Sequence, residues 1–308
     1  MTTTGTLPRR VLILGLGHAG RTLALRLKSL GVAVEGSVRD PAVAPDDGLV
    51  RHRLHAGHAP DAALLAAVAR ADAVLGSVPP DVDGDPALRL LAPALQASSA
   101  LRWAGYLSST AVYGDRDGGW IDEHSRADAT GTTATQRLLA EAQWRALAHG
   151  RGIDSAVFRL PGLYGRGRNA LVRLARGNAR HIVRPGLVFN RLHVEDLAEA
   201  LIAAMRRPSR DALYLPADDE PAPPQDVLAC AARLGGFAMP PAQAWDDPAL
   251  DPALRRFHAS NKRIDSRGTR EALQWQPRFR TYRKGLADAW AAGDGTAVAA
   301  SDMLPQAR

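Results

Sequence analysis

A glycine-rich turn near the start of the chain constrains the fold more than any other stretch. Four apolar residues, Val11 to Leu14, run directly into the turn Gly15–Gly20, which has the pattern G-x-G-x-x-G. Over residues 21–30, apolar residues then recur at helical spacing, and Gly31 ends the run. We therefore expect a buried strand, a tight turn and an amphipathic helix.

Each glycine of this turn has its own physical role. Gly15 permits the tight turn, Gly17 lets the backbone approach a diphosphate, and Gly20 lets the helix pack closely on the strand. The free N–H groups at the start of the helix then face the phosphates. An ordinary strand-to-helix turn would also explain an isolated G-x-G-x-x-G, but the buried strand before it and the helix after it favour a dinucleotide site.

Strand-like and helix-like stretches alternate as far as Gly162. We expect strands over 32–39, 49–54, 73–78, 101–107 and 153–160, and helices over 61–70, 86–96 with an interruption at Pro93, and 132–149. This alternation predicts an α/β protein of Rossmann type, with a doubly wound parallel sheet and helices on both faces.

Beyond Gly162 the alternation loosens, which indicates a smaller α/β lobe over the carboxyl ends of the strands, where open sheets bind ligands. We expect a dinucleotide-binding domain over 8–162, a substrate lobe over 163–293 and a mobile tail over 294–308. The segment 187–205 is expected to return to the first domain. Asp196 and Glu199 have capping-box spacing at the start of a helix over 197–205.

Charge and composition exclude several function classes. Lysine and arginine number 39 against 32 acidic residues, a net charge of +7. Nearly all the basic residues are arginines scattered along the chain without a nucleic-acid motif, so we expect no nucleic-acid partner and only a preference for anionic ligands. With no membrane-length apolar run, no signal-peptide core and Cys230 as the only cysteine, we expect a cytoplasmic protein without disulfides or membrane attachment.

Three histidines spaced by three residues raise the question of a metal site. On one helix His52, His55 and His58 would share a face. Here they straddle a strand end and a loop that contains Gly57, and no cysteine joins them. We expect no metal.

Four ordered motifs resemble the extended short-chain dehydrogenase/reductases, the NAD-dependent epimerase/dehydratase family. They are Gly15–Gly20, Tyr106–Gly114, Phe158–Gly165 and Arg191–Ala198, and the likeness continues to Asn261–Arg263 and Trp275–Pro277, so it covers nearly the whole chain. The resemblance implies a Rossmann domain, a C-terminal substrate lobe and bound NAD(P).

The resemblance, together with the glycine turn, assigns a set of cofactor-binding residues. They are Gly15, Leu16, Gly17, His18, Ala19 and Gly20 of the turn, then Arg39, Val78, Pro79 and Ser108, and finally Pro161, Gly162 and Leu163, which match the loop that lines the nicotinamide. Within the turn we expect His18 to be a variable position that points outward. Pro161 and Gly162 are equally typical of a simple strand-ending turn.

The chain departs from the family at its catalytic pair. The family carries Tyr-x-x-x-Lys on a helix, with a glutamate four residues after the lysine. If Glu141 is that glutamate, Arg137 stands at the lysine position and Thr133 at the tyrosine position. The chain therefore resembles the atypical, YeeZ-like branch, which keeps the fold and the cofactor turn without the pair.

Three residues remain as catalytic candidates. Ser109 matches the family's active-site hydroxyl, although a strand-end serine also caps local backbone. Tyr113 is a candidate substitute acid, although this tyrosine is more often a packing or substrate-wall residue, and an ordinary phenol is a weak acid near neutrality without a cationic neighbour. Arg137 would be that cation, or bind the ribose or a substrate anion, or else form an exposed salt bridge.

The arginines of the lobe are the candidates for substrate binding. Arg166, Arg168 and Arg191, with Arg184, would clamp an acidic substrate, although each alone is typical of a solvated surface. His193 lies in the family's H-V-x-D motif, where the residue is more often structural.

The end of the second strand bears on cofactor choice. NAD-selective sites place a carboxylate there, on the ribose 2′-hydroxyl. This chain has Val38 followed by Arg39, and Glu35 lies too early, within the strand. We expect NADP to be preferred to NAD, because Arg39 offers a bidentate partner to the 2′-phosphate.

Two functions remain open from the sequence. The first is an NAD(P)-dependent, epimerase-like oxidoreductase with a non-standard proton donor. The second is a catalytically silent NADP-binding protein that reports redox state to a partner. The family often forms dimers through two helices, here over 86–96 and 132–149, so we expect a homodimer.

Overall fold

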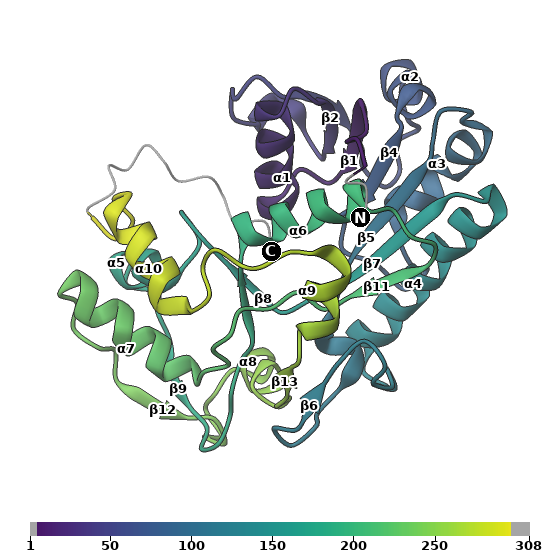
Figure 1. Ribbon diagram of the computed structural model, residues 1–308. Coiled ribbons are helices and arrows are strands. Elements are labelled where there is room, and N and C mark those ends of the chain that lie inside the picture. Colours follow the sequence, from purple (N-terminus) through teal and green to yellow (C-terminus); the bar gives the residue numbers. More distant parts are fainter. Residues whose placement is uncertain (1–4, 297–308) are drawn as a thin grey trace.

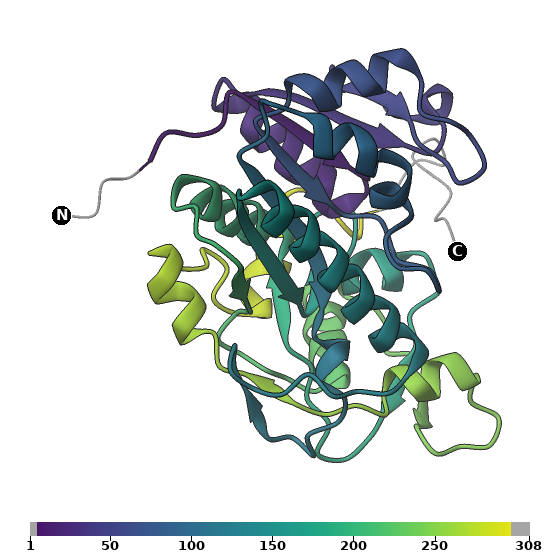
Figure 2. The same cartoon turned by 90° about the vertical axis from the view of Figure 1, so that its right-hand side faces the viewer.

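The computed structural model describes residues 5–296, and it confirms a parallel sheet with helices on both faces (Figures 1 and 2). Its strands are β1 (Arg10–Leu14), β2 (Ala33–Val38), β3 (Val50–Arg53), β4 (Ala73–Gly76), β5 (Trp103–Ser109), β7 (Asp154–Leu160) and β11 (Ala212–Tyr214). They lie in the order β3-β2-β1-β4-β5-β7-β11, and each neighbouring pair is parallel. The strand order reverses between β1 and β4, which places the ligand-binding edge at the carboxyl ends of these two strands.

Two layers of helices cover the sheet because its strands are apolar on both faces. The first layer consists of α1 (His18–Ser29) and α6 (Val194–Arg206), and the second of α2 (Ala62–Arg70), α3 (Pro86–Ala97) and α4 (Thr132–Arg151). Strand β1 divides its side chains between them: Val11 and Ile13 join the first core, and Leu12 and Leu14 join the second.

Helix α3 continues through Pro93, so the expected interruption is wrong. Pro93 lies on the exposed side of the helix, where the carbonyl that loses its partner can bond water. Among residues 5–296, no helix combines the length and the apolar character needed to cross a bilayer.

A second group of elements lies beside the carboxyl edge of the sheet. Helices α5 (Ala170–Ala175), α7 (Pro224–Gly235) and α10 (Tyr282–Ala291) enclose a core of their own and stand together at the left of Figure 1. Three short parallel pairs and two helices connect this group to the sheet: β8 (Gly162–Tyr164) with β10 (Arg191–His193), β9 (His181–Val183) with β12 (Ala242–Ala244), β6 (Trp120–Ile121) with β13 (Arg263–Ile264), then α8 (Pro252–Phe257) and α9 (Arg267–Leu273).

The chain returns to the sheet through α6 and β11, so the returning part extends beyond the expected segment 187–205. Strand β11 has only three residues, too few to show a periodic pattern. At the other end, Asp294 accepts a hydrogen bond from Gly167 N at 2.7 Å, so the segment expected to be mobile begins with an anchored residue. The rest of that segment, 297–308, lies outside the described residues.

The expected capping box at α6 is wrong. The helix begins at Val194, and its N-cap is His193, whose Nδ1 accepts a hydrogen bond from Glu195 N at 3.3 Å. The Asp196 carboxylate instead accepts from Arg278 N at 2.7 Å and from Phe279 N at 2.9 Å. Asp196 thus ties α6 to a segment about eighty residues later, a contact that local spacing cannot reveal.

We predict that Asp196→Ala lowers the free energy of unfolding by about 2–4 kcal/mol, because it leaves one buried and one part-buried backbone donor without an acceptor. Glu199→Ala is the matched control: Glu199 pairs with Arg26 on the surface, and its loss should cost less than about 1 kcal/mol. Urea unfolding measures both. Equal losses for the two variants would contradict this assignment.

Candidate functional site

The glycine turn has the geometry that its sequence requires. Gly15 has a φ of +103°, which L side chains rarely adopt. A Cβ on Gly20 would lie 2.3 Å from the Gly15 carbonyl oxygen and 3.1 Å from Ile13, so close packing of α1 on β1 excludes any side chain there. Ser37 at the end of β2 holds the turn, accepting from Gly15 N through its hydroxyl at 3.0 Å. The predicted backbone roles of Gly15 and Gly20 are confirmed.

Gly17 differs from its neighbours because nothing lies within 4 Å of the position that a Cβ would take. It is the N-cap of α1, where no side chain caps the helix and no acidic residue occupies the first turn. The first N–H groups of a helix have no intrahelical partner. The turn therefore presents open space together with unpaired N–H donors.

His18 does not point outward, contrary to the expectation. Its Nε2 is buried and has no hydrogen-bond partner among residues 5–296. Burial, followed by the charges of Arg168 and Arg21, lowers the pKa of His18 to about 4, so the ring is neutral at neutral pH. The influence of Arg168 shows that the lobe reaches the neighbourhood of the turn.

The other expected cofactor residues are distributed around the carboxyl edge. Val78 lies against Gly15, and a Cβ on that glycine would approach Val78 Cγ2 to 3.1 Å. Arg39 is exposed after β2 and makes no ion pair within the described residues, while Glu35 lies mid-strand and binds Arg70. The segment 161–163 leads from β7 into β8, so it lies beside the end of β5.

Two adjacent serines at the end of β5 point to opposite faces. Ser108 Oγ donates to Glu141 Oε1 at 2.5 Å in the interior, so its side chain does not face the ligand-binding side that the sequence suggested. Ser109 Oγ accepts from Ala111 N at 3.1 Å and caps the short helix Thr110–Tyr113. The Ser109 hydroxyl keeps its own proton available to donate.

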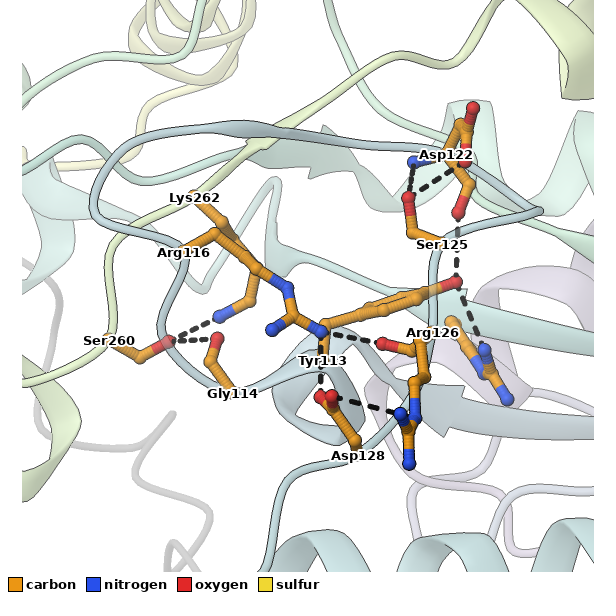
Figure 3. A network of polar contacts seen from close by, with 10 residues as sticks. Tyr113, Gly114, Arg116, Asp122, Ser125, Arg126, Asp128, Ser260 and Lys262 are labelled. Carbon is orange, nitrogen blue, oxygen red and sulfur yellow. Dashed lines mark hydrogen bonds and ion pairs between the residues drawn. The ribbon is translucent and has the colours of Figure 1, made fainter.

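Tyr113 is enclosed in a buried polar network (Figure 3). Its hydroxyl donates to the Asp122 carbonyl at 3.2 Å and accepts from Arg159 Nη1 at 3.0 Å. Arg159 in turn pairs with the buried Glu141 at 2.8 Å. Burial raises the pKa of Tyr113. This geometry favours the packing role over that of a substitute acid.

Arg137, which the sequence analysis aligned with the family's lysine, does not make the exposed salt bridge that was one alternative. Its Nη1 donates to the Leu107 carbonyl at 2.8 Å and to the Tyr106 hydroxyl at 3.2 Å, and it forms no ion pair within residues 5–296. Thr133, which was aligned with the tyrosine, lies one turn earlier on α4 and is exposed. These two positions therefore hold a cation that is bound to β5 and a solvated hydroxyl.

The expected arginine clamp is only partly assembled. Arg166 forms an ion pair with Asp288 at 2.9 Å, and Arg184 donates to the His258 carbonyl and stacks on Trp245. Both are therefore engaged elsewhere in the lobe, and they do not join the clamp.

Arg168 and Arg191 belong to a different group. Neither forms an ion pair within residues 5–296, and Arg191 is buried with two backbone carbonyls as acceptors. Arg173, which the sequence analysis did not select, lies near both of them. Burial and then the charge of Arg168 lower the pKa of Arg173, and Arg173 in turn helps to lower the pKa of Arg191. No motif contains this residue, and only the fold brings it to the site.

The remaining histidines have structural partners. His193 is fully buried, burial lowers its pKa to about 4, and its ring contacts Phe279 with centroids 3.9 Å apart. His52 binds Glu35 at 2.7 Å, whereas His55 and His58 contact each other. No group of three metal-ligating side chains occurs within the described part of the chain.

Comparisons with known proteins agree with this architecture. No curated protein matches the chain. A functionally unknown conserved protein from Silicibacter pomeroyi is 38% identical, with a TM-score of 0.83 over 92% of this chain and 99% of that one.

Two more distant structures share the fold. MoeE5 in complex with UDP-glucose and NAD is 21% identical, with a TM-score of 0.72 over 90% of this chain and 96% of that one. The Thermus thermophilus UDP-glucose 4-epimerase in complex with NAD is 18% identical, with a TM-score of 0.70 over 92% of this chain and 99% of that one.

A family model locates the likeness within the chain. The NAD dependent epimerase/dehydratase family matches residues 11–214, which include the glycine turn, the end of β5 and the strand that returns to the sheet. The chain belongs to the NAD-dependent epimerase/dehydratase family.

Proposed function

We propose that this protein is an NAD(P)-dependent, epimerase-like oxidoreductase that acts on an anionic small molecule. The observation that carries the proposal is the open space above Gly17 at the start of α1, where a Cβ would have no protein atom within 4 Å. A turn that served only to connect strand and helix would need glycine at Gly15 and Gly20, but not at this position.

The residues around the turn suit a dinucleotide. The unpaired N–H groups at the start of α1 would bind its diphosphate, and the buried, unpartnered His18 Nε2 is a further polar group that a ligand would satisfy. Val78 would lie against it on the β4 side. When bound, the nicotinamide supplies a two-electron acceptor or donor.

We further propose that the substrate is anionic and of the nucleotide-sugar class. Arg168, Arg173 and Arg191 form no ion pair within residues 5–296. The buried Asp218 is the acidic neighbour of Arg191, whereas Arg173 lies near the like charge of Arg168, so an anion beside these two arginines would balance their charge. UDP-glucose and UDP-glucuronic acid are bound in the MoeE5 structures.

We also propose that the chain divides into a Rossmann domain and a lobe built on α5, α7 and α10, with the substrate bound between them.

We assign the chain to the atypical, YeeZ-like branch, because neither Thr133 nor Arg137 can replace the missing pair. A threonine hydroxyl is not a phenolic acid, and an arginine stays protonated across the working pH range. Arg137 would position charge, and Ser109 would donate a hydrogen bond to a substrate oxygen. General acid–base help is typically worth ~10²–10⁴-fold, so we expect slow turnover of common family substrates.

The missing pair also favours the second candidate, a silent NADP-binding redox sensor. Single-turnover assays of bound NADPH with carbonyl and nucleotide-sugar substrates separate the two functions. Oxidation of the cofactor supports the enzyme. Absence of oxidation, together with cofactor-dependent capture of a partner protein, supports the sensor.

We propose NADP as the preferred cofactor. No carboxylate stands at Val38, and the exposed Arg39 beside it has no ion-pair partner within the described residues. Asp40, the next residue, caps a short helix and pairs with Arg53 at 3.0 Å, which reduces its repulsion of a phosphate.

Gly17→Val should abolish NADPH binding while the protein remains folded. The new side chain would fill the space for the diphosphate but would meet no protein atom within 4 Å of its Cβ. Calorimetry with NADPH and circular dichroism measure the two effects. Gly150→Val, on α4, is the control, since its Cβ is equally unobstructed and far along the chain from the turn. A folded Gly17→Val protein that keeps its NADPH affinity would disprove the cofactor site.

The wild type should bind NADPH roughly tenfold to a hundredfold more tightly than NADH, the range expected from one charge-assisted contact. Arg39→Ala should remove this preference by weakening NADPH binding alone. Arg26→Ala, on α1 in a surface ion pair with Glu199, should leave it intact. Equal dissociation constants for the two cofactors in the wild type would rule out the assignment to NADP.

We propose a homodimer through α3 and α4, which flank a surface hollow of about 560 Å³ lined by Leu88, Ala92 and Leu147, among others. Sedimentation equilibrium should give twice the chain mass. Leu139→Asp on α4 should dissociate the dimer. Leu65→Asp on α2 should not, although both leucines are 41% exposed. A monomeric wild type at working concentration would refute the dimer.

A further inference from the structure

Lys262 is a buried lysine at the carboxyl edge of the sheet, and the function proposed above gives it no role. Only 7% of the Lys262 residue is exposed to solvent. Its ammonium donates to Ser260 Oγ, and that hydroxyl donates to the Gly114 carbonyl at 2.8 Å. Figure 3 shows this chain of contacts from the lysine to the turn that follows Tyr113. Gly114 follows directly on the short helix that Ser109 caps.

The backbone on both sides holds Lys262 in this position. Asn261 N donates to the Asp115 carboxylate at 2.7 Å, and Arg116 N donates to the Asn261 carbonyl at 2.9 Å. From the other side, Asn190 Nδ2 donates to the Lys262 carbonyl at 2.8 Å. The backbone at Lys262 is therefore fixed by three long-range hydrogen bonds, two of which lead to the segment that follows Gly114.

Lys262 forms no ion pair within residues 5–296. Asp115 is its acidic neighbour, but the Asp115 carboxylate accepts hydrogen bonds from the backbone N–H groups of Asn261 and Asp117, and it also lies near the positive charge of Arg184. Arg116 adds a like charge. Burial is the main cause that lowers the pKa of Lys262 to about 8, with Arg116 adding to the effect and Asp115 opposing it. The amine therefore gives up its proton at a lower pH than an exposed lysine does.

We propose that the Lys262 amine, acting through the Ser260 hydroxyl, is the proton reservoir that replaces the family's phenol–ammonium pair. This inference rests on the proposed oxidoreductase function. When a substrate alcohol is oxidised to a carbonyl, its C–H bond breaks as a hydride passes to the bound nicotinamide, and its O–H bond breaks as a proton leaves. The Ser260 hydroxyl, turned from the Gly114 carbonyl to the neutral Lys262 amine, accepts that proton as it passes its own to the amine. The reverse reaction returns the proton.

The alternatives at this edge of the sheet are less suitable. The Tyr113 hydroxyl is bound on both sides, and its pKa is raised by burial. Arg137 cannot give up its proton. Lys262 combines a backbone fixed beside the segment after Gly114 with an amine whose pKa is lowered by burial, and it contacts the half-buried Ser260.

The first test needs no substrate. The chain has three lysines, Lys28, Lys262 and Lys284, so selective ¹³C-lysine labelling gives three Cε signals. The signal missing from the Lys262→Met variant should titrate with a midpoint near pH 8 in the NADH-bound protein. A midpoint above 10 would overturn the inference.

The second test measures NADH formation from NAD with UDP-glucose and UDP-glucuronic acid as probes. Lys262→Met should lose about 10²–10⁴-fold of the rate, the usual worth of acid–base help. Lys284→Met, an exposed lysine, is the control. NADH affinity should remain unchanged in both variants, which shows that they are folded. In Lys262→Ala, added ethylamine should restore the rate in proportion to its neutral fraction, a rescue that a purely structural role would not allow.

The outcomes separate this inference from the proposed function. If the wild type oxidises a probe and Lys262→Met is equally fast, or if ethylamine fails to rescue Lys262→Ala, the lysine has no proton role and the oxidoreductase function stands. If the wild type binds NADH but oxidises neither probe, the proposed oxidoreductase function fails and this inference fails with it.

Discussion

The close contact between α1 and β1 is the constraint on which the ligand-binding edge depends. A Cβ at Gly20 would lie 2.3 Å from the Gly15 oxygen, so the helix can approach the strand only because that side chain is absent. This approach places the start of α1, with its unpaired N–H groups, directly at the carboxyl end of β1. Val78 from β4 and Ser37 from β2 then close around the turn. A helix start of this kind can bind an anion with backbone N–H groups alone, without a charged side chain in the turn.

Buried polar contacts between distant segments hold the lobe and the sheet together. The Asp196 carboxylate binds the backbone at Arg278 and Phe279, and Asn190 and Asp115 bind the backbone on either side of Lys262. Leaving a buried donor without an acceptor costs more free energy than a formed hydrogen bond contributes. Any other placement of the lobe would break these contacts and would therefore be less stable. The same contacts bring the end of β5 and the C-terminal segment into one site, and this site joins parts of the chain about 150 residues apart.

Much of the fold could be predicted from local pattern, and less of the site. Each predicted strand of the first half is present, because buried parallel strands leave continuous apolar runs in the sequence. Strand β11 was missed because three residues carry no periodicity. Ser108 and Ser109 are neighbours in sequence, and only the observed pleat shows that Ser108 faces Glu141 in the interior. Arg173 and Lys262 were passed over because their significance lies in neighbours that belong to other elements.

The sequence by itself determined the strand–turn–helix at the amino terminus, the parallel sheet with helices on both faces, and the need for glycine at Gly15 and Gly20. These features depend on residue types at fixed short spacings, and short spacings translate directly into backbone geometry. Only the tertiary structure decided which polar groups are free. Asp196 serves a distant backbone instead of its own helix, Tyr113 is bound on both sides, and the Lys262 amine has no ion-pair partner within residues 5–296. Burial and charge pairing are sums over neighbours from the whole chain, and no local pattern contains them.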